Sequence, residues 1–174
     1  MEIKARIAIT GRPGVGKTTL IREVLARTPL SFGGMITEEV RKCGGRVGFS
    51  VIDLATGEEG ILAHVHGGGG PLLGRYRVRL DDLERVGVAA IRRAVAEKEL
   101  VVIDEVAPME LLSPAFVPAV EEALASGKAL LISTHANADH PIAHRVRQEL
   151  TLFRVRLSNR DLLVEEIARA LGAA

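Results

Sequence analysis

The first thirty residues contain a short apolar run followed by an amphipathic segment. Residues 5–10 form a β-type run that stops at Gly11, and residues 17–27 carry apolar side chains at the three- and four-residue spacing of a helix. Glycine is frequent in the residues between the two. The pattern therefore predicts a strand, a glycine-rich loop and a helix, in that order.

The pattern changes after this helix, where three short β-type runs are separated by turn residues. The runs are Met35–Thr37, Val47–Leu54 and Gly60–Val65, and the turns are residues 42–45 and 55–57. Glycine-containing turns of this length connect neighbouring antiparallel strands. We expect an antiparallel β-meander inserted after the first helix.

A further stretch alternates apolar residues with Arg75, Arg77 and Arg79. This alternation is typical of a half-exposed strand, although three arginines in a stripe could also bind phosphates or RNA. Asp81 or Asp82 then offers an N-cap for the helix that follows. We interpret the stripe as a strand face.

The second half of the chain alternates apolar strands with amphipathic helices. The predicted strands are residues 100–103, 129–133 and 152–157. The predicted helices include Ile142–Glu149 and two that begin behind the caps Ser113-Pro114 and Ser158-Asn159-Arg160-Asp161. Continuous apolar runs such as residues 100–103 are typical of parallel strands that are buried on both faces. We therefore expect one α/β domain over residues 1–174, with a mainly parallel central sheet.

Composition restricts the class of partner. The chain has 23 Lys and Arg against 22 Asp and Glu, a single cysteine, Cys43, and only 3% aromatic residues. The net charge of +1 is too small to attract nucleic acid by long-range electrostatics. No apolar run approaches the ~18 residues of a membrane span. We expect a cytoplasmic monomer without membrane or nucleic-acid partners, in which any phosphate chemistry is local.

The residues from Gly11 to Thr18, GRPGVGKT, match the phosphate-binding loop in full. Glycines let successive amide groups point at phosphate oxygens, and the helix that follows adds its positive end. Lys17 can reach the β- and γ-phosphates, and the Thr18 hydroxyl can bind Mg²⁺. The predicted nucleotide-binding residues are Gly11, Arg12, Pro13, Gly14, Val15, Gly16, Lys17, Thr18 and Thr19. With this motif, the predicted fold is a three-layer P-loop NTPase.

The strongest acidic candidates end the most apolar strand. Asp104 can serve as a second Mg²⁺ ligand, and Glu105 can orient or deprotonate an attacking water. An adjacent Asp-Glu pair resembles the P-loop branch that uses a catalytic glutamate, in which a further strand separates the phosphate-loop strand from the acidic strand. That strand is here residues 128–134, which places Ser133, Thr134 or His135 beside the γ-phosphate as a sensor.

Other candidates carry weaker signals. Arg145 and Arg147 follow the proposed sensor strand and are candidates for a transition-state arginine. The histidines do not have the spacing of a zinc site. Cys43 lies in a glycine turn, where we interpret it as a turn residue rather than a reactive thiol. The glycine run at residues 67–70 is left without an assigned role.

Across most of the chain, these motifs and their order resemble the THEP-type nucleoside-triphosphatase family, also called cancer-related nucleoside-triphosphatases. The specific elements are Thr37-Glu38-Glu39-Val40-Arg41 and Met109-Glu110-Leu111, with Arg46-Val47-Gly48-Phe49 and Asn159-Arg160-Asp161. The resemblance implies Mg²⁺-dependent hydrolysis of ATP, GTP, CTP and UTP with little base selectivity. Val106-Ala107-Pro108 departs from the usual Ile-Gly-Lys, so any role of that lysine has no counterpart here.

Three functions fit these observations. The leading hypothesis is hydrolysis of NTP to NDP and phosphate, with Glu105 and Lys17 as catalytic residues and Thr18 and Asp104 as metal ligands. A nucleotide or nucleoside kinase would use the same loop but would need a lid that excludes water, for which residues 67–79 are the candidate. A nucleotide-switched binding module would show a large exposed apolar or basic patch, which the sequence lacks.

Overall fold

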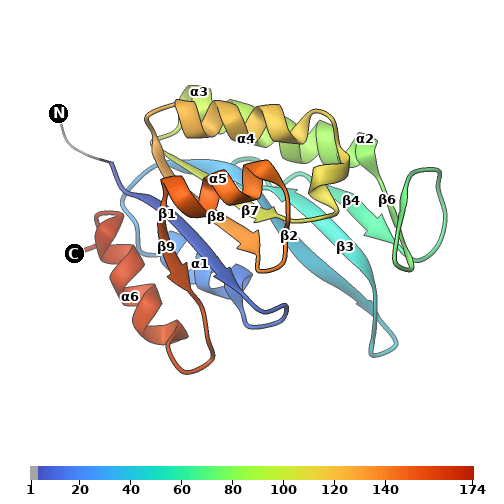
Figure 1. The fold of residues 1–174 in the computed structure, drawn as a ribbon, viewed down its shortest axis with the longest axis horizontal. Helices are drawn as coiled ribbons and strands as arrows, with labels where there is room; N and C mark the ends of the chain where they lie inside the picture. The colour runs from blue at the N-terminus through green and yellow to red at the C-terminus, as the bar shows by residue number, and fades with distance from the viewer. Residues whose placement is uncertain (1–3) are drawn as a thin grey trace.

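The computed structural model describes residues 4–174, and within them nine strands form one sheet (Figure 1). The strands are β1 (Arg6–Gly11), β2 (Phe32–Lys42), β3 (Gly45–Asp53), β4 (Glu59–His64), β5 (Leu72–Leu73), β6 (Tyr76–Val78), β7 (Leu100–Val106), β8 (Ala129–His135) and β9 (Thr151–Arg154). The helices are α1 (Lys17–Leu25), α2 (Leu80–Asp82), the π-helix η1 (Leu83–Val88), α3 (Ala89–Glu97), the 3-10 helix η2 (Glu110–Leu112), α4 (Phe116–Ala125), α5 (Pro141–Glu149) and α6 (Arg160–Ala170).

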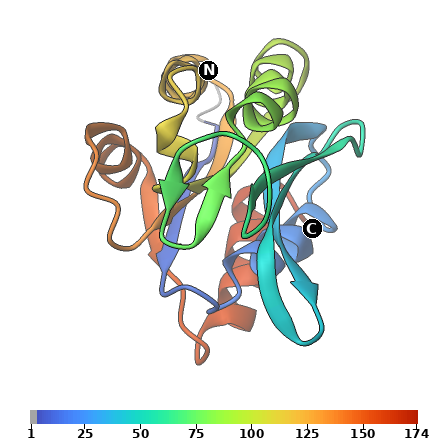
Figure 2. The same cartoon turned by 90° about the vertical axis from the view of Figure 1, so that its right-hand side faces the viewer.

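The sheet is mixed, with the order β5-β6-β4-β3-β2-β7-β8-β1-β9. From β2 to β9 every pairing is parallel, and from β2 to β5 every pairing is antiparallel. The expectation of a mainly parallel sheet is therefore wrong, whereas the antiparallel meander expected after the first helix is present as β2, β3 and β4. β2 belongs to both parts because residues 32–35 pair with β7 and residues 35–42 pair with β3. We call residues 32–35 of β2 together with β7, β8, β1 and β9 the parallel half. Residues 36–42 of β2 together with β3, β4, β6 and β5 are the antiparallel arm, which faces the viewer in Figure 2.

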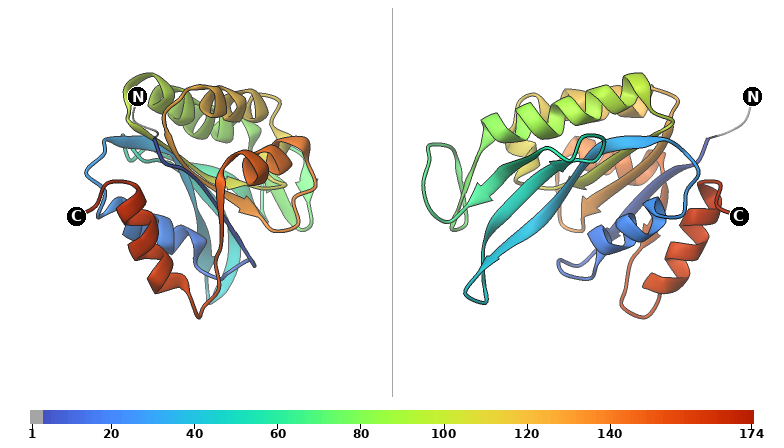
Figure 3. Two further views of the ribbon diagram at one scale, coloured as in Figure 1. Left: turned by 60° about the vertical axis from the view of Figure 1, so that its left-hand side comes forward. Right: turned by 180° about the vertical axis from the view of Figure 1, so that it is seen from behind.

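Helices cover both faces of the sheet. α1 and α6 lie on one face, and α3, α4 and α5 lie on the other (Figures 1 and 3). Each side has its own hydrophobic cluster, with Leu20 and Ile167 in one and Ile91 and Phe116 in the other. Leu100–Ile103 is fully buried between the two clusters, as expected for a central parallel strand. Among residues 4–174, no helix combines the length and apolar character needed to cross a membrane.

The helices that follow the predicted side-chain caps do not begin where those caps place them. Asp82 accepts a hydrogen bond from the Ile61 backbone N–H at 2.8 Å, and the helix begins earlier, at Leu80. Ser113 donates to Glu84 at 2.8 Å, and α4 begins only at Phe116. The capping box expected over residues 158–161 is one residue out of place, because the N-cap of α6 is Asn159 and not Ser158. The Asn159 side chain accepts from the Arg156 backbone N–H at 2.8 Å and does not cap the helix.

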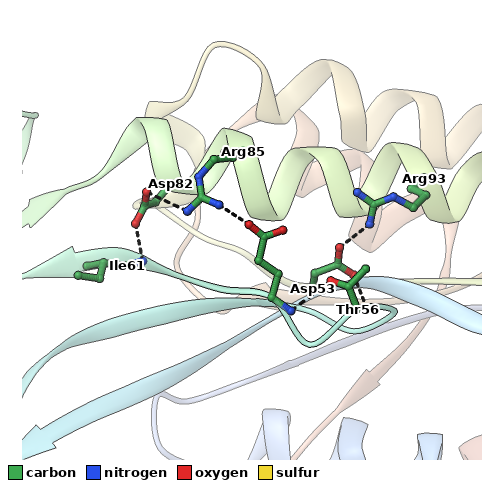
Figure 4. A network of polar contacts seen from close by, with 7 residues as sticks. Asp53, Thr56, Ile61, Asp82, Arg85 and Arg93 are labelled. Atoms are coloured by element: carbon green, nitrogen blue, oxygen red, sulfur yellow. Dashed lines mark hydrogen bonds and ion pairs between the residues drawn. The ribbon is translucent and has the colours of Figure 1, made fainter.

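Ion pairs attach the antiparallel arm to the helix above it (Figure 4). Arg93 of α3 donates to the buried Asp53 at the end of β3, and Arg85 of η1 pairs with Glu58. Asp53 also accepts the backbone N–H groups of residues 55 and 56, which closes the turn between β3 and β4. These contacts fix the arm relative to the helical layer and hence relative to the parallel half.

Candidate active site

The carboxyl ends of β1, β7 and β8 meet at one edge of the sheet because the three strands are parallel. This edge opens into a cavity of about 850 Å³. Of the predicted nucleotide-binding residues, Pro13, Gly14, Gly16, Lys17, Thr18 and Thr19 line the cavity, whereas Gly11, Arg12 and Val15 complete the loop without lining it. Asp104, Glu105 and His135 line it from β7 and β8. The structure thus brings most of the predicted site together.

The phosphate loop has a backbone that only glycine adopts readily. Gly14 and Gly16 have φ values of 76° and 98°, in the left-handed region. Gly16 is also the N-cap of α1, which receives no hydrogen bond from a capping side chain and has no acidic residue in its first turn. The first N–H groups of α1 and its positive end are therefore free to bind an anion.

Lys17 is buried at the base of the loop, with only 8% of its surface exposed. Its Nζ donates to the Gly11 carbonyl at 3.0 Å and lies 3.8 Å from Glu105 Oε2, beyond hydrogen-bond distance but close enough for an ion pair. The ammonium group is thus positioned between the loop and the acidic strand. This is where the β- and γ-phosphates of a bound nucleotide would lie.

Asp104 is held by two hydroxyl groups. Thr18 Oγ1 donates to its Oδ2 at 2.6 Å, and Ser133 Oγ donates to its Oδ1 at 2.5 Å. Burial raises the pKa of Asp104, and the two hydrogen bonds and nearby Lys17 oppose this rise. A hydroxyl and a carboxylate in contact are hard oxygen donors, which suit Mg²⁺.

Residues 4–174 contain no group of three or more His, Cys, Asp or Glu side chains that could hold a metal by themselves. This fits Mg²⁺ in nucleotide sites, where the ion usually takes one or two protein ligands, waters and substrate phosphates. The predicted pair Thr18 and Asp104 would supply two protein ligands of this kind.

Glu105 and Glu110 place two further carboxyl groups in the cavity wall. Burial raises the pKa of Glu105 to about 7, against the opposing effect of Lys17. Glu110 is 2% exposed, and burial and the charge of Glu105 hold its pKa well above the usual value. Oε2 of each carboxyl group has no hydrogen-bond partner among the described residues. Glu110 had no role in the sequence prediction, where its only signal was its place in Met109-Glu110-Leu111.

The sensor candidates differ in position. β8 lies between β1 and β7 as predicted, but Ser133 holds Asp104, and Thr134 is buried away from the cavity lining. Only His135 lines the cavity. Its Nδ1 accepts from the Asn137 backbone N–H at 3.1 Å, and burial and Lys17 lower its pKa. The neutral ring therefore carries its proton on Nε2, which leaves a hydrogen-bond donor.

Neither candidate arginine reaches the cavity. Arg145 pairs with Glu149 and Glu121 on the surface, and Arg147 donates to the Ala138 carbonyl at 2.9 Å. The side chain of Arg160 instead packs against the phosphate loop at Gly16. A Cβ atom added to Gly16 would lie only 2.7 Å from Arg160 Nη1.

The loop of residues 67–70 packs closely against the side chain of Arg79. A Cβ atom added to Gly68 would lie only 2.7 Å from the Arg79 guanidinium. These glycines do not line the large cavity, although Leu73 does. The loop is therefore placed beside Arg79 and not over the phosphate loop.

Comparisons with known proteins identify the family. A family model described as NTPase matches residues 6–168. Nucleoside-triphosphatase THEP1 of Methanosarcina acetivorans is 53% identical over 166 residues, which cover 93% of this chain and 94% of that protein. The crystal structure of THEP1 from Aquifex aeolicus is similar with a TM-score of 0.86 and 29% identity, covering 95% of this chain and 98% of that one. The solution structure of a human cancer-related nucleoside triphosphatase has a TM-score of 0.77 and 32% identity, covering 97% of both chains. The chain therefore belongs to this NTPase family.

Proposed function

We propose that the chain, as one P-loop domain, hydrolyses nucleoside triphosphates to diphosphates and phosphate with Mg²⁺ and little preference for the base. The observation that carries this proposal is the contact of Thr18 with Asp104 beside the phosphate loop, with Glu105 in the same cavity. Names of the relatives and of the similar structures agree with this reaction. Weak base selectivity is supported by the cavity lining. Phe49 is the one Phe, Tyr or Trp side chain that the described residues contribute to this lining, so few rings are present to recognise a base.

Phosphate binding is assigned to the loop and to Lys17. Amide groups of residues 14–19 at the start of α1 bind the phosphate oxygens, and Lys17 exchanges its contact with the Gly11 carbonyl for the β- and γ-phosphates. Thr18 and Asp104 would hold Mg²⁺, directly or through water, and Ser133 keeps the Asp104 carboxylate in place. When bound, the ion neutralises charge that develops on the phosphate oxygens.

Water attack is assigned to Glu105. Its carboxylate orients a water molecule in line with the γ-phosphorus and accepts the proton as the oxygen–phosphorus bond forms. The bond to the oxygen that bridges the β- and γ-phosphates breaks, and its electron pair leaves with NDP. His135 Nε2–H can donate to a γ-phosphate oxygen, which is the sensor role expected for the end of β8.

Glu105→Gln tests the assignment of the base. The amide keeps the size of the side chain but accepts no proton, so kcat should fall by about 10²–10⁴-fold while the Kd for β,γ-imido-ATP stays within a factor of about three. Phosphate release and calorimetric titration measure the two quantities. Glu97→Gln on the exposed end of α3 is the control and should keep full activity. Substantial turnover in Glu105→Gln would exclude Glu105 as the general base.

Phosphate release across the common NTPs and dNTPs, measured without any acceptor, tests the reaction class. Release that is similar for all bases supports a hydrolase with low base selectivity. Release that depends on a nucleoside or nucleotide acceptor would instead show a kinase.

A further inference from the structure

The large cavity extends well beyond the phosphate loop and Asp104. Its far end, which we call the distal chamber, is formed by the free part of β2 and by the antiparallel arm. Residues 36–42 of β2 continue past the stretch that pairs with β7, so they rise beside the acidic strand as a wall. The distal chamber is lined by Glu39, Arg41, Arg46, Phe49, Leu62 and Leu73.

The distal chamber lies on the γ-phosphate side of the site. β7, which carries Asp104 and Glu105, lies in the sheet between β1 and β2. The phosphate loop follows β1, and the strands of the chamber lie on the other side of β7. Lys17 can reach the β- and γ-phosphates of a nucleotide bound in the loop. The nucleoside is attached at the other end of the phosphate chain, away from the γ-phosphate and the acidic strand. The chamber is therefore on the side from which the γ-phosphorus is attacked, and the nucleoside of the bound NTP does not fill it.

Arg46 is oriented by two hydrogen bonds and two aromatic rings in this wall. Its Nε donates to Tyr76 Oη at 2.9 Å, and its Nη1 donates to Glu39 Oε1 at 3.2 Å. Its guanidinium carbon lies 5.0 Å from the centre of the Phe49 ring and 5.7 Å from that of Tyr76. The Arg46 side chain is nevertheless 40% exposed. A planar guanidinium that is oriented by such contacts and remains accessible can stack on a flat ring and pair with an anion.

The charges of the distal chamber do not balance. Arg41 and Arg46 share one carboxylate, Glu39, at 3.0 and 3.2 Å. Arg75 adds a third guanidinium behind them, since it donates to Tyr76 Oη at 3.1 Å. Burial raises the pKa of the Tyr76 phenol, but the hydrogen bonds from Arg46 and Arg75 outweigh burial and lower it, as expected in a locally positive field. The surplus of positive charge favours an anionic ligand.

Apolar residues complete the distal chamber. Phe49 and Leu73 are partly buried against the core and Leu62 is 1% exposed, so they offer an apolar surface next to the arginines. The whole cavity, at about 850 Å³, is near the upper end of the ~300–1,000 Å³ typical of small-molecule sites. It therefore has room for a second small molecule beside the triphosphate.

We propose that the distal chamber binds a second ligand beside the γ-phosphate of a bound NTP. This ligand is a phosphate monoester that also carries an aromatic base, of the size of a nucleoside monophosphate. The flat ring stacks on Arg46 and the apolar side chains, and the phosphate is paired by the surplus guanidinium charge. The position of the ligand, though not the existence of the chamber, rests on the proposed binding of NTP in the loop.

Calorimetric titration of AMP, GMP, CMP and UMP into the protein tests the proposal, with the loop first saturated by Mg²⁺ and β,γ-imido-ATP. We expect saturable binding of at least one monophosphate, weakened about tenfold or more by Arg46→Ala. Phe49→Leu removes the ring that supports Arg46 and should also weaken binding, and it serves as a second variant if Arg46→Ala does not fold. Arg92→Ala, which removes an exposed pair with Glu122 on the helical layer, is the control and should bind like the unmodified protein.

Three results would overturn the proposal. These are no binding of any monophosphate to the saturated protein, binding that displaces β,γ-imido-ATP, and binding that Arg46→Ala and Phe49→Leu leave unchanged. Displacement would assign the chamber to the nucleoside of the substrate. Hydrolysis of NTP is measured separately without monophosphate, so an active enzyme that fails to bind monophosphates contradicts this inference alone, and an inactive protein that binds them contradicts only the proposed function.

Discussion

The parallel half and the antiparallel arm belong to one sheet but contribute to the cavity in different ways. The parallel half supplies buried groups at strand ends, such as Asp104 at 2% and Ser133 at 0% exposure. The arm supplies a wall of exposed ion pairs, such as those of Arg41 and Arg46 with Glu39. Buried, hydrogen-bonded groups are fixed in position, whereas exposed ion pairs contribute little to stability.

The groups proposed to carry out hydrolysis therefore lie in a different part of the sheet from the residues proposed to bind a second ligand. Groups that must bind metal and phosphate are held by two parallel strands and a helix start, where small movements are opposed on both faces by the core. Substitutions in the parallel half should therefore change turnover, and substitutions in the arm should change stability or binding of a second ligand.

Lys17→Ala should give the largest effect. The variant removes the only lysine in the cavity lining of the described residues, and both nucleotide binding and turnover should fall, with kcat/KM lower by about 10²–10³-fold or more. Lys42→Ala, at the exposed end of β2 in the hairpin to the arm, is the matched control and should hydrolyse NTP normally. Phosphate release at several NTP concentrations measures both. Equal losses in the two variants would show that the division between the halves is wrong.

Gly16→Ala should give the next largest loss of activity. Its Cβ would lie 2.7 Å from Arg160 Nη1, so the Arg160 side chain must move away from the loop, and the φ of 98° is strained for alanine. Both changes disturb the phosphate loop, so kcat/KM should fall by about 10²-fold. Gly44→Ala is the control in the turn between β2 and β3, where φ is 76° and no atom lies within 4 Å of the added Cβ. It should cost about 1 kcal/mol of stability and no activity. An active Gly16→Ala variant would contradict a rigid loop.

Ser133→Ala should have a smaller effect because Ser133 acts through Asp104. Without the hydrogen bond at 2.5 Å, the carboxylate is less well oriented, so turnover should fall by about tenfold and half-maximal activity should need more Mg²⁺. Ser50→Ala removes a buried hydroxyl from β3 and should leave both quantities unchanged. A lower rate with an unchanged Mg²⁺ requirement would indicate a role other than positioning Asp104.

Contiguous motifs were the part of the site that the sequence could predict. The phosphate loop and Asp104-Glu105 each combine a local pattern with a strand end, and the comparisons confirm the family that these motifs suggested. Strand β2 was predicted only over Met35–Thr37 because Glu38 and Glu39 interrupt the apolar pattern. It continues to Lys42 because β3 supplies its hydrogen bonds.

Contacts between distant residues were not predictable in this way. Arg145 follows the sensor strand closely in sequence, but it points toward Glu149 and Glu121. Arg46 and Tyr76 are thirty residues apart and meet only because β3, β4 and β6 are neighbours in the sheet. The continuation of the parallel sheet into the antiparallel strands was missed for the same reason, since no local pattern shows that β2 pairs on both sides.

Asp53→Asn tests the arm itself and should change stability without changing turnover. The side chain is 1% exposed and pairs with Arg93, which is 38% exposed, so solvent screens the pair. We therefore expect a loss of about 1–2 kcal/mol, less than the ~3–5 kcal/mol for a fully buried pair. Urea unfolding measures the loss, and Glu58→Gln, which removes the exposed pair with Arg85, should stay within about 0.5 kcal/mol of the unmodified protein.

The pH dependence of the stability lost in Asp53→Asn shows whether the ion pair with Arg93 is its cause. Burial alone would raise the pKa of Asp53, but hydrogen bonds from Arg93 and the turn backbone hold it below the ordinary value of 3.8. A carboxyl group with a lowered pKa in the folded state stabilises the protein fully above its unfolded pKa and loses this contribution as pH falls through the folded pKa. The stability difference between the unmodified protein and Asp53→Asn should thus be constant above about pH 5 and shrink below about pH 4. A difference that is the same at pH 3 and pH 7 would show that packing, and not the ion pair, attaches the arm to α3.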